Sequence, residues 1–438
     1  MSDQVKRVLF ISYYWPPSGK ASLHWPLNIT RHLPEFGWEP IILTVKNESF
    51  TIKDESLLKE VRPDLKVIKT HAFEIFNVYR RFMGKKKHEP LSVSETMSTE
   101  NKGFRHRLSL WIRMNLFVPD ARIGWYCSAV RGGKRLINSL KNKTSHPKPV
   151  QAIISIGTPH STHLIGKKLS QIFDIPHLPF FSDPWTSISY YRHFKRNFLA
   201  ERLDNYFEKS VLENARKVIF VTQNTRDEYI RKYNFLKDKT NILYWGYNEA
   251  DFARLNEFSK NTMKTEILLH AGNLFDYQNP VNFWQTIRKR IDFGRKMILR
   301  FTGTVGSGIR KSIKENGLSD YCEYLGFLPY SQLLKELSAA DYLLVCPYDS
   351  RHVPGKLFEY LRIGKPIIAF CDDNTEISNI LKETRAGMLF PYNSSGSEFF
   401  ERLNELKTDI AKVKRFDRYN ISKELSKILD NVLNTKAY

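Results

Sequence analysis

The residues whose types and spacing best suit chemistry lie close together around position 356. Pro354, Gly355, Lys356 and Glu359 open a stretch with helical spacing. Proline is tolerated in a first helical turn, and glycine lets the backbone approach a ligand. Lys356 and Glu359 share one helix face beside the positive end of the dipole, where the lysine could meet phosphate and the carboxylate could accept from ribose hydroxyls. A surface ion pair is the alternative interpretation of this spacing.

Two buried strands are predicted to hold this helix in place. An apolar run over 340–347 precedes it, Gly364 ends it, and 366–370 forms the next apolar run. In a doubly wound parallel sheet such a helix points its N-terminus at the crevice along the strand ends. Similar apolar runs occur at 267–273, 297–303 and 322–329. This part of the chain is therefore predicted to be a parallel α/β domain.

The N-terminal half begins with the same alternation. A buried strand over 6–12 leads into a loop with Gly19 and Lys20, then a helix over 23–36 and a strand over 37–45. The first loop of a doubly wound sheet is a usual place for phosphate or acceptor contact. This loop lacks both the G-x-G-x-x-G and the Walker spacing, so its composition alone is weak evidence for a phosphate-binding site.

Two further candidates follow apolar segments of this half. His160 comes after the apolar run 152–157, at the carboxyl end of a predicted strand. A lone loop histidine is more often a helix cap, and His163 is the lesser candidate. Asp183 precedes Pro184, which favours an extended backbone and leaves the carboxylate free to face a cleft. Residues 175–179 before it are predicted to be an extended segment and turn, and 218–222 to be the last strand of the first domain.

These motifs resemble the retaining GT-B glycosyltransferases, specifically the large fourth family. The run Pro-Gly-Lys-Leu-Phe-Glu-Tyr-Leu from Pro354, followed by Gly364-Lys-Pro, is similar to that family's donor-binding helix. The resemblance extends from Val8 to about Phe390. It implies an α/β fold with two Rossmann-like doubly wound domains facing a cleft, and sugar transfer with retention.

The resemblance also implies roles for individual residues. Glu359 would hold the ribose of a nucleotide-sugar donor, and His160 would face the transferred sugar. The catalytic candidates are His160 and Asp183, and the donor-binding candidates are Gly19, Lys20, Gly272, Asn273, Arg351, Pro354, Gly355, Lys356, Leu357 and Glu359. No D-x-D carboxylate pair follows a strand, which agrees with a metal-independent site without a cofactor.

The sequence departs from the family pattern around the diphosphate. Related enzymes usually carry an arginine and a lysine in the loop that corresponds to residues 272–280, which here contains no basic residue. The family's frequent first carboxylate falls at Arg351, and Ser182 replaces a usual arginine. We expect Arg351, Lys356 and Lys20 to clamp the diphosphate instead. Without such replacement, a nucleotide-binding subunit with weak turnover is the alternative.

Length and charge bound the remaining possibilities. A chain of 438 residues with 42% hydrophobic content predicts two domains, 1–250 for the acceptor and 251–438 for the donor. The last helix, 420–438, is expected to cross back to the first domain. The net charge of +22 implies an acidic partner such as nucleic acid, anionic lipid or phosphorylated small molecules. Nucleic-acid binding is a second alternative, disfavoured because no RNA- or DNA-binding module is recognised.

The excess charge is concentrated in one segment. Residues 80–148 contain 16 Lys and Arg against 4 Asp and Glu. Within the basic segment 80–118, residues 104–118 are predicted to form a basic amphipathic helix with Trp111 on its apolar side; packing on its own domain is the alternative. With 85–87, it predicts an anionic membrane surface as partner and a lipid-linked glycan acceptor in surface polysaccharide biosynthesis.

Four scattered cysteines and the lack of a signal peptide or spanning run predict a cytoplasmic protein, peripheral at the inner face of the cell membrane.

Overall fold

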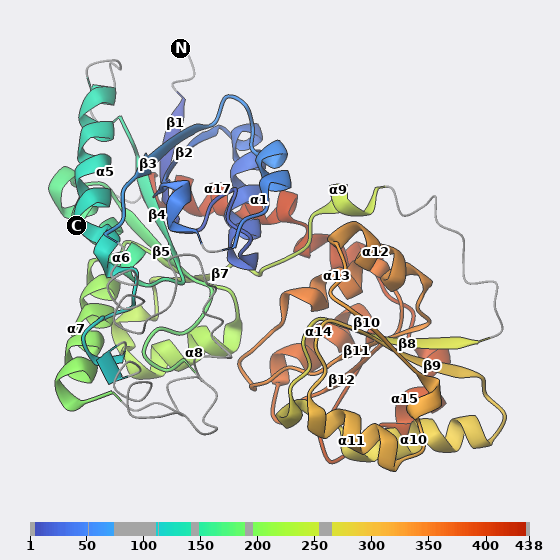
Figure 1. The fold of residues 1–438 in the computed structure, drawn as a ribbon. Coiled ribbons are helices and arrows are strands. Elements are labelled where there is room, and N and C mark those ends of the chain that lie inside the picture. Colours follow the sequence, from blue (N-terminus) through green and yellow to red (C-terminus); the bar gives the residue numbers. More distant parts are fainter. Residues whose placement is uncertain are drawn as a thin grey trace. The chain divides into compact units, whose positions relative to one another are not determined.

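The computed structural model describes residues 5–50, 52–73, 111–112, 114–141, 149–188, 196–253 and 265–434. The chain divides into two compact units, each built on one parallel sheet (Figure 1). The first unit comprises Met1–Val221, Thr225–Leu243 and Ser422–Tyr438, and the second comprises Thr222–Asn224 and Tyr244–Ile421. The first unit thus takes its last helix from the C-terminal end of the chain.

In the described residues the first sheet has seven strands in the order β3-β2-β1-β4-β5-β6-β7, all parallel. Their bounds are β1 (Lys6–Ile11), β2 (Trp38–Val45), β3 (Lys66–Thr70), β4 (Ala152–Gly157), β5 (His177–Phe181), β6 (Val218–Phe220) and β7 (Thr240–Ile242). The strand order reverses between β1 and β4, which is the topological switch point where such sheets place ligands.

Helices cover both faces of this sheet. They are α1 (His24–His32), α5 (Tyr126–Lys141), α6 (Ser161–Phe173), α7 (Phe198–Asn214), α8 (Gln223–Lys232) and α17 (Arg418–Asn434). In β1, Leu9 and Ile11 pack in one core with residues of α5 and α6. Because successive strand residues point to opposite faces, Val8 and Phe10 are buried on the other side. Helix α17 is fastened to this unit by Asp430, which accepts from Trp38 Nε1 at 2.9 Å.

The second sheet has six described strands, all parallel, in the order β10-β9-β8-β11-β12-β13. Its strands are β8 (Glu266–Ala271), β9 (Met297–Thr302), β10 (Cys322–Gly326), β11 (Tyr342–Val345), β12 (Ile367–Phe370) and β13 (Gly387–Phe390). Its helices are α9 (Glu249–Phe252), α10 (Val281–Asp292), α11 (Ser307–Glu315), α12 (Tyr330–Ala339), α13 (Gly355–Ile363), α14 (Thr375–Thr384), α15 (Ser397–Glu401) and α16 (Ile410–Val413). Separate apolar cores on its two faces complete the predicted pair of doubly wound domains.

Three local predictions differ from the structure. The segment predicted as extended chain and turn forms strand β5, with Pro179 opposite Ser155. The first sheet does not end at β6, because the short, half-buried strand β7 pairs with it. Helix α1 ends at His32 and continues as a 3-10 turn over Leu33–Phe36, since Pro34 cannot donate to the helical ladder.

The predicted basic helix lies largely outside the described residues. Of 104–118, only 111–112 and 114–118 are described, and 85–87 is not described. Trp111 and Leu116 are exposed, whereas Met114 and Asn115 are buried. Among the described residues, no helix is both long and apolar enough to cross a membrane.

Candidate functional site

Helix α13 begins and ends where its sequence signals predict. Pro354 is its extended N-cap, and Gly364 ends it with φ +78°. Leu357 packs in the core, and its N–H donates to the Pro354 carbonyl at 2.9 Å. A Cβ at Gly355 would lie 2.8 Å from Trp245 Cδ1. Glycine is therefore needed for packing of the first turn against this indole, besides any approach of a ligand.

Lys356 places a partly desolvated cation at the first turn of α13. Its Nζ lies 3.4 Å from Nε2 of the buried His270, the penultimate residue of β8. Burial lowers the pKa of Lys356 to about 8, with Glu359 offsetting this in part. Burial and the nearby lysine lower the pKa of His270 well below its usual value. Keeping Lys356 charged in this site costs free energy. An anionic ligand beside the helix N-terminus would offset that cost.

Glycines make room beside this lysine. Gly272 has φ +93° after β8, and a Cβ there would lie 3.1 Å from Lys356 Nζ. Gly303 has φ +87° after β9, and its Cβ would lie 2.7 Å from the Gly272 carbonyl carbon. Asn273 is exposed, and its Oδ1 accepts from Thr304 N at 3.1 Å. The two loops are packed too closely for side chains at the glycines, which leaves backbone facing the lysine.

Glu359 does not form the ion pair with Lys356 that the spacing allowed. Its Oε1 accepts from the Tyr330 hydroxyl at 3.0 Å, while Lys356 turns toward His270. Burial raises the pKa of Glu359, and Tyr330 and Arg418 partly offset the rise. The carboxylate and the ammonium of one helix are thus kept apart, each available to a different part of a ligand.

Arg351 is held by a carboxylate that the sequence interpretation did not single out. Its backbone N, Nε and NH2 donate to Asp349 at 2.9, 3.0 and 2.9 Å. The loop is fixed further by Asn374, whose Nδ2 donates to the His352 carbonyl at 3.0 Å. The Arg351 guanidinium is thus paired with Asp349.

In the first unit His160 lies at the carboxyl end of β4, where it was predicted. It is buried and stacks on Trp185, with ring centroids 4.9 Å apart and an interplanar angle of 5°. Burial lowers the pKa of His160 to about 3, which the Pro184 backbone offsets only in part. His163 points into the core, where its Nδ1 lies 2.8 Å from Ser155 Oγ. His160 is therefore a neutral imidazole near pH 7, suited to hydrogen bonding rather than to carrying charge.

Asp183 follows a turn that Ser182 fastens to the end of β4. The Ser182 hydroxyl donates to the Gly157 carbonyl and accepts from Thr158 N at 3.2 Å. The Ser182 oxygen also lies 3.3 Å from Asp183 Oδ2, to which its single hydrogen could be donated instead. Burial raises the pKa of Asp183. The serine thus takes a structural role at the position where related enzymes are expected to carry arginine.

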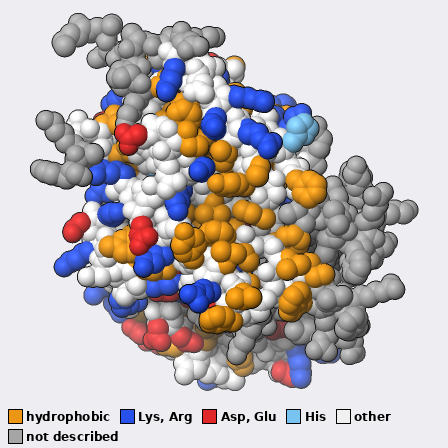
Figure 2. Space-filling view, turned by 90° about the vertical axis from the view of Figure 1, so that its left-hand side faces the viewer, with side chains coloured by type: hydrophobic (Ala, Val, Ile, Leu, Met, Phe, Trp, Pro, Cys, Tyr) orange, Lys and Arg blue, Asp and Glu red, His pale blue; other side chains and the backbone are white. Residues whose placement is uncertain are grey.

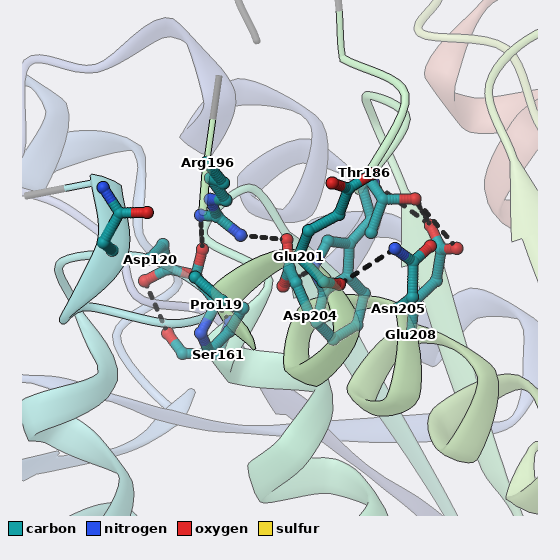
Figure 3. A network of polar contacts seen from close by, with 12 residues as sticks. Pro119, Asp120, Ser161, Thr186, Arg196, Glu201, Asp204, Asn205 and Glu208 are labelled. Carbon is teal, nitrogen blue, oxygen red and sulfur yellow. Dashed lines mark hydrogen bonds and ion pairs between the residues drawn. The ribbon is translucent and has the colours of Figure 1, made fainter. Parts of the chain in front are cut away.

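A polar network that the sequence interpretation missed joins Asp204, Arg196 and Pro119 (Figure 3). Trp185 Nε1 donates to Asp204 at 2.8 Å, and Arg196 pairs with the same carboxylate. Arg196 also donates to the Pro119 carbonyl at 2.8 Å (Figure 3). The network positions the tryptophan on which His160 stacks.

The same network has two further carboxylates, the half-buried Asp120 and the fully buried Glu208. Asp120 accepts from Ser161 N at 2.8 Å and so caps the start of α6, and burial raises its pKa. Glu208 accepts from Thr186 N at 3.1 Å and from the Tyr229 hydroxyl at 2.7 Å. An acidic residue at helical spacing gives no sequence signal of such burial, because its partners come from distant segments.

The first loop of the chain is held in place by contacts with Ile52. Gly19 N donates to the Ile52 carbonyl at 2.9 Å, and a Cβ on Gly19 would lie 2.8 Å from Ile52 Cγ2. Lys20 is partly exposed and belongs to the first unit, whereas Lys356 and Arg351 belong to the second. Among the described residues, no group of three or more His, Cys, Asp or Glu side chains is arranged to hold a metal ion.

Residues 251–423 match the family model for glycosyl transferases group 1. A probable glycosyltransferase, WbjE from Pseudomonas aeruginosa, is 23% identical over 214 residues, covering 45% of this chain and 52% of that protein. The match therefore spans about half the length of this curated relative.

Solved structures resemble the whole chain. Sucrose-phosphate synthase from Thermosynechococcus elongatus has a TM-score of 0.59 at 15% identity, covering 98% of this chain and 99% of that one. Anabaena HepE in complex with UDP and glucose has a TM-score of 0.58 at 13% identity, covering 97% and 100%. The lipopolysaccharide outer core galactosyltransferase WaaB has a TM-score of 0.56 at 13% identity, covering 97% and 99%. The fold is the GT-B fold, with two Rossmann-like domains, as predicted.

Proposed function

Because residues 251–423 carry a glycosyl transferases group 1 domain, we propose that this protein is a glycosyltransferase that moves a sugar from a nucleoside-diphosphate donor to a glycan acceptor. The observation that carries the proposal is the first turn of α13. Lys356 offers an ammonium there, beside the backbone of the Gly272 turn that follows β8, and Glu359 offers a carboxylate one turn further along the helix.

The donor would lie along this turn. Its diphosphate would meet Lys356 and the N-terminus of α13, and its ribose hydroxyls would donate to Glu359. When the sugar leaves, negative charge grows on the diphosphate, and fixed cations and N–H groups stabilise it without a metal ion. A neighbour of the same fold, Anabaena HepE, was solved with UDP, which supports a uridine nucleotide as the first donor class to try.

The first unit would supply the acceptor side. His160 is neutral and held flat against Trp185, so it can hydrogen-bond a sugar hydroxyl without neutralising the oxocarbenium-like transition state. Asp183 would add a carboxylate for the acceptor or for the positive charge at the anomeric carbon. We propose transfer with retention, as the resemblance to the fourth GT-B family implies.

The acceptor is proposed to be a lipid-linked glycan in surface polysaccharide biosynthesis, reached at the inner face of the cell membrane. The basic composition supports an anionic surface as partner. The neighbour WaaB is a lipopolysaccharide outer core galactosyltransferase, and lipopolysaccharide is itself a glycan joined to lipid.

A second candidate function is a nucleotide-sugar-binding subunit with little turnover. It is favoured by the loop 272–280, which contains no basic residue, and by the pairing of Arg351 with Asp349. If neither Arg351 nor Lys20 reaches the diphosphate, Lys356 would be the one cation of these three that stabilises the leaving group.

Thermal-shift measurements with UDP, GDP, ADP, CMP and TDP test the proposed donor site. One nucleotide should raise the melting temperature of the wild type, because a ligand at 100 times its Kd adds about 2.7 kcal/mol to stability. Lys356→Ala and Glu359→Ala should each reduce the shift, and Lys289→Ala, on the exposed surface of α10, should keep it. An unchanged shift in both site variants would show that the donor is held elsewhere.

A further inference from the structure

Helix α7 exposes several large apolar side chains and buries two acidic ones together with Ala200, Val211 and Leu212, unlike a usual surface helix. Leu199, Leu203 and Tyr206 are 75%, 43% and 63% exposed, and their spacing of four and three residues places them on one face. The opposite face buries Asp204 and Glu208 in the network of Figure 3. The apolar face is therefore not part of the core of the first unit.

Positive charge lies on the two helices next in line, α6 and α5, whereas α7 itself carries the exposed Glu201 and Glu213. Helix α5 carries Arg131, Lys134, Arg135 and Lys141, all exposed, and no acidic residue. Helix α6 packs against both α5 and α7, adds Lys167 and Lys168, and also has no acidic residue. Figure 2 shows a broad apolar area on this side of the first unit, with Lys and Arg side chains gathered along its upper part.

A groove joins the two kinds of surface. It has a cavity volume of about 410 Å³ and is lined by Tyr126 of α5, Leu164, Lys167 and Lys168 of α6, and Tyr206 and Phe207 of α7. Burial lowers the pKa of Lys167, and Glu213 of α7 offsets this in part. Amines above an apolar wall match an anionic headgroup joined to a hydrocarbon chain.

We propose that the face formed by α5, α6 and α7 docks on a bilayer that contains anionic phospholipid. The apolar side chains of α7 enter the interfacial region, the basic side chains of α5 meet the headgroups, and the groove seats one lipid. A second copy of this chain is a poor occupant, since a two-fold interface would place α5 and α6 against the same basic helices. This inference depends on the proposed function in one respect, namely that the acceptor is linked to a lipid.

Flotation with vesicles tests the docking face. The full-length protein should float with phosphatidylcholine vesicles that contain phosphatidylglycerol, and not with pure phosphatidylcholine, and binding should weaken as salt rises. Each basic side chain near such a surface adds roughly fivefold to the partition coefficient. The double variant Lys134→Glu with Arg135→Glu should therefore bind at least about 25-fold more weakly.

Apolar insertion is tested separately. Leu199→Glu with Leu203→Glu should also lose most binding, and Phe198→Ser, at a side chain 71% exposed, is a milder variant if the double variant folds poorly. The matched controls lie on the second unit. Phe327→Glu, at a side chain 91% exposed, and the double variant Lys289→Glu with Lys407→Glu should bind vesicles like the wild type.

The results separate this inference from the proposed function. Vesicle binding that survives the α5 and α7 variants, or that falls equally in the controls, overturns the docking face. So does a change of the α7 variant from dimer to monomer in sedimentation velocity, which would identify a self-association surface. The nucleotide-induced thermal shift should be retained in all these variants, and its absence in the wild type would instead count against the proposed donor site.

Discussion

Raising the pH from 7 to 9 should weaken nucleoside-diphosphate binding about tenfold, because Lys356 loses its proton over this range. Burial lowers the pKa of this lysine to about 8 in the ligand-free protein. About nine tenths of the side chain is then charged at pH 7 and about one tenth at pH 9. The free energy of binding should therefore fall by about 1.4 kcal/mol.

The direction follows from linkage. A bound diphosphate favours the ammonium form, so the pKa of Lys356 is higher in the complex than in the free protein. Between these two pKa values, binding takes up a proton, and affinity declines as the pH rises. The ligand adds no slope of its own above pH 7, because the second ionisation of a phosphate has a pKa near 6.

Titration calorimetry with the nucleotide that gives the largest thermal shift measures this profile. Lys356→Arg is the informative variant, since a guanidinium stays charged and should bind with an almost flat profile from pH 7 to 9. The reasoning is refuted by a flat wild-type profile, or by an arginine variant that loses affinity as steeply as the wild type.

Three further predictions concern other residues of the site. Glu359→Ala should weaken nucleotide binding by about 1.5–3 kcal/mol while Tyr330→Phe has a smaller effect, because hydrogen bonds to a charged group are the stronger kind; calorimetry decides, and equal affinities of Glu359→Ala and wild type contradict the ribose assignment. His160→Ala should lower kcat about 10²–10³-fold with little change in donor affinity, whereas equal losses of both would make the histidine structural. Asp120→Ala should lower the free energy of unfolding, measured by urea denaturation, by about 1–3 kcal/mol, because Ser161 N loses its acceptor. The surface variant Asp64→Ala should have a smaller effect, and similar values for the two variants would contradict the capping role of Asp120.

Local signals in the sequence sufficed where a boundary depends on nearby residues. Pro354 and Gly364 bracket α13 because their backbone preferences start and stop a helix without help from the rest of the chain. Strand β7 shows the opposite case. A strand and turn over 241–248 were predicted as the connection that enters the second domain, but the structure pairs this short, half-buried strand with β6 in the first sheet. Its pairing is a tertiary contact, which no local signal predicts.

The surroundings of the candidate site could not be read from spacing. Lys356 and Glu359 have the helical spacing of an ion pair, yet each finds a partner from another segment, His270 and Tyr330. Helix α7 is a stronger case. Its hydrophobic residues would be assigned to the core by periodicity, but Asp204 is buried instead because the distant Trp185 and Arg196 pair with it. The roles of the individual site residues stay predictions.

Acceptor-dependent release of a nucleoside diphosphate in the presence of EDTA is the most direct test of the central claim. The purified protein would be incubated with UDP-sugars and a lipid-linked glycan fraction, and both UDP and extended glycan would be measured. The proposed function predicts that transfer persists in EDTA. The transfer rate should fall strongly in Lys356→Ala, because several kcal/mol of transition-state stabilisation are lost, and should be unchanged in Lys289→Ala. Nucleotide binding without any transfer by the wild type across the donor and acceptor panel would contradict a glycosyltransferase and support the binding subunit.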